Sequence, residues 1–205
     1  MKKVKAVACD MNSDFSEAFQ ERCPHLKIVY DYFHIVKNFN EKVISPVRLD
    51  IVNDLKSQGK FDEARKFKGQ KYLLCMSRST REKREKEAQE GKVIKKKSEI
   101  FKTPEIKRTR KCERDYNLLL LTQNKLLLTL DLIKDHLQYA FAADKTEEIK
   151  KEINLIINEC KVAGNKHLLW FARLLKNHYD GIVSHAEHKI STGKIEGINN
   201  KINYY

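Results

Sequence analysis

Three acidic residues occupy positions where their carboxylates could do chemistry. Asp10 and Asp31 each directly follow a short apolar run, VKAVAC at residues 4–9 and KIVY at residues 27–30, and Glu196 follows a Ser-Thr-Gly turn. Carboxylate oxygens are hard ligands that suit Mg²⁺ or Mn²⁺. Two such ions about 4 Å apart can hold the attacking and leaving oxygens of a phosphodiester. Acids at these positions also serve as helix caps and surface residues, so the spacing alone leaves both interpretations open.

The elements that must position Asp10 and Asp31 are a strand, a helix and a second strand. The apolar stretches at 4–9 and 27–30 predict short buried strands, and residues 13–22 between them have helical spacing. In open α/β sheets, ligands and catalytic groups collect at the carboxyl ends of strands, where both aspartates are expected. After residue 32 we expect no further strand. We expect helices over 33–55 (with a kink at Pro46), 61–67, 115–142, 146–162, 166–179, 182–188 and 194–201.

The chain is strongly basic, with 41 Lys and Arg residues against 28 Asp and Glu and a net charge of +13 over 205 residues. Such a balance favours a polyanionic partner, nucleic acid first. Residues 78–114 are rich in Lys and Arg and poor in apolar residues. This segment is expected to be a solvated linker, partly disordered or helical, or to contact DNA phosphates, or both. The candidates for DNA contacts are Lys95, Lys96, Lys97, Arg108, Arg110 and Lys111.

Composition disfavours several classes of protein. The most Leu-rich stretch, 118–143, is interrupted by polar and charged residues, so it lacks the roughly 18 consecutive apolar residues of a membrane span. No signal peptide is visible, and we expect a cytoplasmic protein without a membrane partner. Five scattered cysteines fit buried thiols better than disulfides. A zinc site at Cys23, His25 and His34 is an alternative whose spacing matches no strong zinc pattern.

Two motifs are specific when they occur together. Residues 31–34 form a D-x-F-H motif followed by Ile-Val-Lys, and residues 196–200 form a late E-G-x-N-N motif. With Asp10 upstream in an Ala-Cys-Asp-Met sequence, this order resembles the DDE transposases of bacterial insertion sequences, of the ISL-three type. The resemblance covers about residues 4–203 and is weakest over 78–114.

The resemblance implies an α/β fold in which helices dominate. It is the fold of a fragment of a ribonuclease-H-like catalytic core, with a strand–helix–strand start and a final helix, interrupted by a large all-helical insertion. Residues 1–34 would belong to the core, 35–190 to the insertion with its basic segment 78–114, and 191–205 to the final core helix. The strands-then-helices order predicted from the residues agrees with this arrangement.

The resemblance also implies roles for individual residues. Asp10 would be the family's second catalytic aspartate and Glu196 its catalytic glutamate, and both would bind Mg²⁺ or Mn²⁺. Supporting positions near the active site would be Asp31, His34, Asn199 and Asn200, and further phosphate contacts would be Lys194 and Lys201. The implied reaction is metal-dependent cleavage and transfer of DNA strands in a bacterial cytoplasm, at the nucleoid when DNA is bound. The implied partners are transposon ends, target DNA, and a second copy or a full-length transposase.

The family's first catalytic aspartate lies on a strand that precedes those found in these 205 residues. We therefore expect this chain to be inactive by itself. An alternative from another class is a non-catalytic basic protein that binds DNA or interferes with a full-length transposase. Metal dependence separates the two hypotheses, because a binding protein should hold DNA equally well in EDTA.

Overall fold

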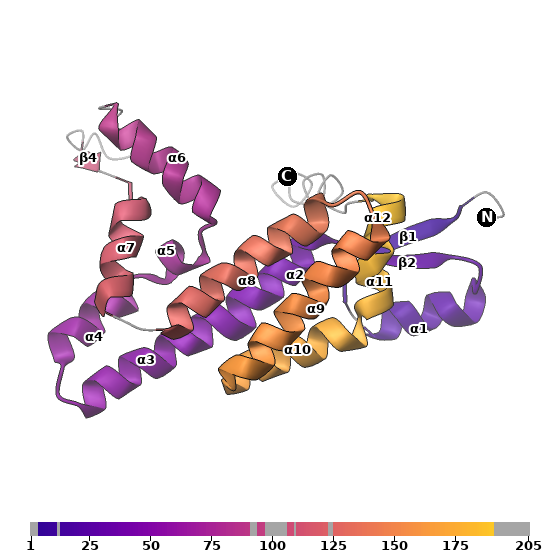
Figure 1. Cartoon of the computed structure of the whole chain (residues 1–205), viewed down its shortest axis with the longest axis horizontal. Helices are drawn as coiled ribbons and strands as arrows, with labels where there is room; N and C mark the ends of the chain where they lie inside the picture. Colours follow the sequence, from indigo (N-terminus) through magenta and orange to yellow (C-terminus); the bar gives the residue numbers. More distant parts are fainter. Residues whose placement is uncertain are drawn as a thin grey trace, which may run out of the picture. The chain divides into compact units, whose positions relative to one another are not determined.

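The computed structural model describes residues 4–11, 13–90, 94–96, 106–108, 110–122 and 125–190 (Figure 1). Helices dominate this part of the chain, which also contains two pairs of strands. The chain divides into two compact units. Unit 1 comprises residues 1–47 and 133–205, and unit 2 comprises residues 48–132. The fold is a helix-dominated α/β fold with a small parallel sheet, as predicted.

The sheet of unit 1 is a parallel strand pair. β1 (Ala6–Cys9) pairs with β2 (Lys27–Tyr30), and α1 (Ser13–Arg22) connects them (Figure 1). This confirms the predicted strand–helix–strand order. Because Cys9 and Tyr30 are paired residues, Asp10 and Asp31, which follow them, lie at the same edge of the sheet.

The predicted long helix after β2 contains a π-helical turn. It consists of α2 (Tyr32–Phe39), the π turn η1 (Asn40–Ile44) and α3 (Ser45–Ser57), and the amide of Ser45 donates to the carbonyl of Asn40 five residues earlier. Pro46 has no N–H, and its ring crowds the carbonyl four residues earlier. The irregularity predicted at Pro46 therefore takes the form of a π turn directly before it.

The remaining elements of unit 1 are helices close to the predicted ranges. After the second half of α8 (Lys125–Ala142) come α9 (Thr146–Ala163), α10 (Lys166–Asn177), α11 (Tyr179–Val183) and α12 (His185–His188). The buried isoleucines of α9 recur at helical spacing and pack against α10. Gly164 ends α9 with a φ of +65°, a conformation that glycine adopts without strain. No helix among the described residues is both long and apolar enough to cross a membrane.

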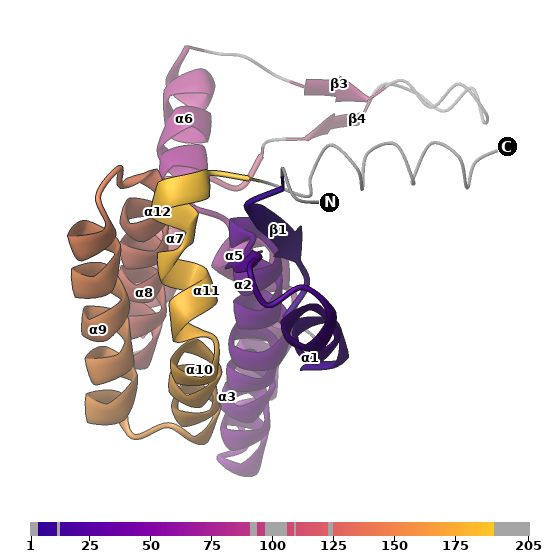
Figure 2. The same cartoon turned by 90° about the vertical axis from the view of Figure 1, so that its right-hand side faces the viewer.

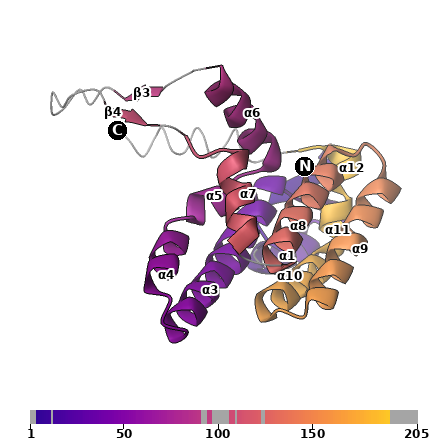
Figure 3. The ribbon, with the colours of Figure 1, turned by 60° about the vertical axis from the view of Figure 1, so that its left-hand side comes forward.

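Unit 2 corrects two expectations. Besides α4 (Phe61–Lys68), α5 (Lys71–Cys75), α6 (Arg78–Gln89) and α7 (Glu113–Thr122), it contains β3 (Ile94–Lys96) and β4 (Ile106–Arg108) as an antiparallel pair (Figure 3). The prediction of no strand after residue 32 is therefore wrong. Within residues 78–114, α6 is helical and carries a fully buried residue, Arg81. The expected helix over 115–142 is described as two helices, α7 and α8.

Candidate functional site

Asp10 presents an accessible carboxylate at the carboxyl end of β1. Its side chain is 55% exposed, and Oδ1 accepts a hydrogen bond from the Met11 amide at 2.7 Å. Nδ1 of His34, a buried residue, lies 3.4 Å from the same oxygen. One oxygen of Asp10 is thus held by the protein, while the carboxylate as a whole stays open to a ligand.

Asp31 organises the helix that carries His34. Asp31 is 3% exposed, and its Oδ1 accepts a hydrogen bond from the Phe33 amide at 3.2 Å as the N-cap of α2. An N-cap acid satisfies an amide of the first helical turn and interacts favourably with the positive end of the helix dipole. His34 lies in that first turn, so the D-x-F-H motif combines a capping acid with the histidine next to Asp10.

His185, a residue that sequence analysis did not single out, lies close to Asp31. Its buried ring packs edge-on against Phe141, with centroids 4.9 Å apart. Burial lowers the pKa of His185, the Asp31 carboxylate opposes this shift and Lys189 adds to it. His185 is far from Asp31 in the sequence, and no local spacing pattern connects them.

α11 packs closely against the carboxyl end of β2. A Cβ atom at Gly181 would clash with Cε2 of Tyr30, so only glycine fits here without a shift. His178 packs edge-on against the same ring, with centroids 5.0 Å apart. Burial raises the pKa of the Tyr30 hydroxyl, and its hydrogen bond with the Ser16 side chain opposes this shift. These contacts hold the strand end from which Asp31 emerges.

The described residues contain no group of three or more His, Cys, Asp or Glu side chains placed to hold a metal ion. Cys23, His25 and His34 lie in that part of the chain and are not brought together in such a group. Asp10 supplies the hard oxygen donors that suit Mg²⁺, but its predicted partner Glu196 falls outside the described residues. Also outside them are Lys97, Lys194, Asn199, Asn200 and Lys201.

The basic candidates of unit 2 lie in two settings. Lys95 and Lys96 belong to β3 and Arg108 belongs to β4. Arg110 lies 3.8 Å from Glu87, and Nζ of Lys111 donates a hydrogen bond to Oε1 of Gln70. Arg110 and Lys111 thus already contact side chains of the protein.

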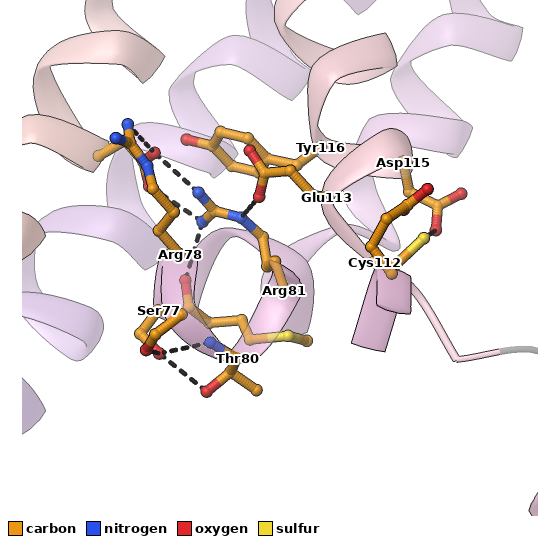
Figure 4. Close-up of polar contacts among 12 residues, drawn as sticks. Ser77, Arg78, Thr80, Arg81, Cys112, Glu113, Asp115 and Tyr116 are labelled. Atoms are coloured by element: carbon orange, nitrogen blue, oxygen red, sulfur yellow. Dashed lines mark hydrogen bonds and ion pairs between the residues drawn. The ribbon is translucent and has the colours of Figure 1, made fainter. Parts of the chain in front are cut away.

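A buried charge cluster surrounds Arg81, and the motifs and spacing described above did not indicate it (Figure 4). The Arg81 guanidinium donates to both carboxylate oxygens of Asp131, at 2.9 and 2.7 Å, and to Glu113 at 2.6 Å. It also donates to the Met76 carbonyl at 3.0 Å and lies 3.7 Å from the centroid of the Tyr116 ring. Asp131 lies in the Leu-rich run, and an aspartate in an apolar stretch indicates a buried ion pair because a buried Asp requires a partner.

The Arg81 cluster keeps its charges. Burial by itself would lower the pKa of Arg81, but the hydrogen bonds and charges of Asp131 and Glu113 raise it above the usual value. Burial also raises the pKa of Tyr116, whose hydroxyl donates to the Leu127 carbonyl at 3.3 Å. The cluster therefore joins α6, α7 and the start of α8 through a charged arginine and a neutral tyrosine.

Comparison with known proteins identifies the class as a transposase of the DDE type. The profile of the ISL-three transposase family matches residues 1–205, and the chain belongs to this family. A curated relative, the transposase for insertion sequence element IS1001 of Bordetella parapertussis, is 26% identical over 200 residues. Those residues are 98% of this chain and 42% of the relative, so the chain spans less than half of that protein's length. No solved structure matches the chain.

Proposed function

We propose that the protein takes part in metal-dependent cleavage and transfer of DNA strands at the ends of an insertion sequence. The observation that supports this most directly is Asp10, a half-exposed carboxylate at a strand end that lies 3.4 Å from the buried His34. Because the chain spans 42% of its curated relative, the activity is proposed for the transposase that carries this segment. Residues 1–34 and 191–205 would belong to a ribonuclease-H-like core, and 35–190 to its insertion.

Asp10 and Glu196 are the residues proposed to hold Mg²⁺ or Mn²⁺. Such an ion, when bound, would supply a Lewis acid that stabilises negative charge on the phosphodiester and lowers the pKa of a bound water. His34 would orient Asp10, and Asp31 would orient His34 by capping α2. Asn199 and Asn200 would support Glu196.

Manganese binding by the 205-residue chain tests these assignments. We expect Asp10→Asn and Glu196→Gln each to weaken Mn²⁺ binding, measured by electron paramagnetic resonance, at least about tenfold. Asp54→Asn is the matched control, because Asp54 is an exposed aspartate on α3 in unit 2. Wild-type affinity in Asp10→Asn would overturn the proposed role of this residue.

DNA is the proposed partner, both as transposon ends and as target. The proposed phosphate contacts are Lys95, Lys96, Lys97, Arg108, Arg110, Lys111, Lys194 and Lys201. A second copy or a full-length transposase is a proposed protein partner, and the bacterial cytoplasm and nucleoid the proposed location. The inactivity of the 205-residue chain by itself stays a prediction, which strand transfer by the purified chain with Mg²⁺ and insertion-sequence ends would contradict.

A second candidate is DNA binding without catalysis, which the basic composition of β3 and β4 favours. A purely binding protein should show the same DNA affinity in EDTA and in Mg²⁺, with a steep loss as salt rises. A catalytic segment should in addition bind Mn²⁺ through Asp10.

A further inference from the structure

We propose that β3 and β4 form a basic ribbon whose Lys95–Lys107 face binds the phosphate backbone of duplex DNA. The proposal rests on the proposed function for the identity of the polyanion, and it assigns the contact to one face of one element. It also adds Lys107, which sequence analysis did not single out.

The strand register places the two lysines together. β3 reads Ile-Lys-Lys and β4 reads Ile-Lys-Arg, four cations without an acid. Lys95 pairs with Lys107, while Ile94 pairs with Arg108 and Lys96 with Ile106. Directly opposed residues of an antiparallel pair share a face of the ribbon, with Cα atoms about 4.5–5.5 Å apart. One face thus carries the Lys95–Lys107 pair, and the opposite face combines each remaining cation with an isoleucine.

A pair of opposed lysines is unfavourable unless an anion accompanies it. Like charges directly opposite each other destabilise an antiparallel pair. Phosphates remove this repulsion, and DNA supplies them at a spacing that two neighbouring lysines can reach. A two-stranded ribbon also has dimensions that fit the major groove of duplex DNA. The register is therefore better explained by a bound polyanion than by stabilisation of the ribbon itself.

The helices that carry the ribbon are fastened to each other at its base. β3 follows α6 and β4 precedes α7, and both strands extend away from the ends of these helices (Figures 2 and 3). Arg81 of α6 donates to Glu113 in the first turn of α7 at 2.6 Å, and the Arg114 amide donates to Glu85 at 3.1 Å. Because the base is held by these contacts, less conformational freedom remains to be lost when the ribbon binds.

Neighbouring cations near the base are already engaged. Arg110 contacts Glu87 and Lys111 contacts Gln70, so their charge and donors are partly used within the protein. The ribbon face is therefore assigned the main contribution to phosphate binding, and Arg110 and Lys111 at its base a smaller contribution.

The test measures DNA binding by the 205-residue chain in EDTA, using a short fluorescein-labelled duplex of arbitrary sequence over a series of salt concentrations. We expect Lys95→Gln with Lys107→Gln to weaken binding roughly 10- to 100-fold at moderate salt, and to reduce the slope of log K against log salt by about 1.8. The matched control is Lys56→Gln with Lys60→Gln, two exposed lysines of unit 2 outside the ribbon. The charge-conserving pair Lys95→Arg with Lys107→Arg should bind like the wild type.

Three outcomes overturn the proposal: no binding by the wild type, equal losses in the ribbon and control variants, or failure of the arginine pair to bind. Circular dichroism of each variant verifies that helix content is retained. Because EDTA removes divalent ions, the result is independent of Mn²⁺ binding at Asp10. A ribbon that fails this test leaves the metal assignment standing, and loss of that assignment leaves the ribbon result intact.

Discussion

The side chain of Arg81 has no exposed surface, although it carries a full charge. Burying a guanidinium costs on the order of several kcal/mol of solvation free energy, and only good geometry offsets this cost. Here Asp131 accepts two parallel hydrogen bonds, Glu113 accepts a third and the Met76 carbonyl accepts a fourth. Parallel bonds from the planar fork of arginine cannot be reproduced by lysine.

Arg81→Met is expected to lower the free energy of unfolding by about 3–5 kcal/mol, because it leaves the Asp131 carboxylate buried without its main partner. The matched control is Arg78→Met. The side chain of Arg78 is 51% exposed and lies 3.4 Å from the same buried Asp131 carboxylate. An exposed pair contributes about 0–1 kcal/mol. Denaturant unfolding of both variants makes the comparison, and equal losses would contradict the importance of burial.

At the scale of elements, the cap of α2 connects local stability with the site. Asp31→Ala removes the acceptor for the Phe33 amide, and we expect a loss of about 0.5–2 kcal/mol in the free energy of unfolding. Asp31→Asn keeps a side-chain oxygen that can cap the helix, so it should retain most of that stability. Chemical denaturation measures the difference. Similar losses in both variants would show that Asp31 acts through its charge rather than as a cap.

Elements with their own periodic pattern could be predicted from the sequence. α9 has its isoleucines at helical spacing and a glycine at its end. These two features predict the helix and its end without any knowledge of tertiary contacts. β3 and β4 could not be predicted, because a three-residue strand of mixed isoleucine and basic residues shows neither alternation nor a continuous apolar run. Their pairing is a property of the two strands together.

At the scale of the whole chain, the site could be predicted only in part. The position of Asp10 beside Asp31 follows from the parallel register of two adjacent strands, which local patterns indicate. Two interactions depend on how distant helices pack. One is the electrostatic effect of Asp31 on His185, and the other is the pairing of Arg81 with Asp131, 50 residues later in the chain. A net charge of +13 reveals an attraction to polyanions, but it does not show which lysines share a face.

The stability of the whole molecule should depend on pH through His185. Burial lowers the pKa of this histidine in the folded state, so below pH 6.5, its ordinary value, the unfolded chain binds a proton more readily than the folded one. Stability is then full above pH 6.5 and is lost as the pH falls toward the lowered value, with a slope of up to about 1.4 kcal/mol per pH unit.

His185→Gln should flatten this dependence, while His25→Gln, at an exposed position, should leave it unchanged. Unfolding free energies measured in denaturant at several pH values on either side of 6.5 provide the comparison. An unchanged pH profile in His185→Gln would contradict the assignment.

The π turn at Asn40–Ile44 has a consequence for how the chain tolerates changes in length. Its backbone bond spans five residues where a regular helix spans four, so this turn holds one residue more than its neighbours. Removing one residue here would yield an ordinary α-helical turn and leave the buried faces before and after it in phase. The same deletion inside α9 would rotate every later side chain by about 100° and turn its isoleucines away from the core. This turn is thus a place where the coding sequence can lose a codon at little structural cost.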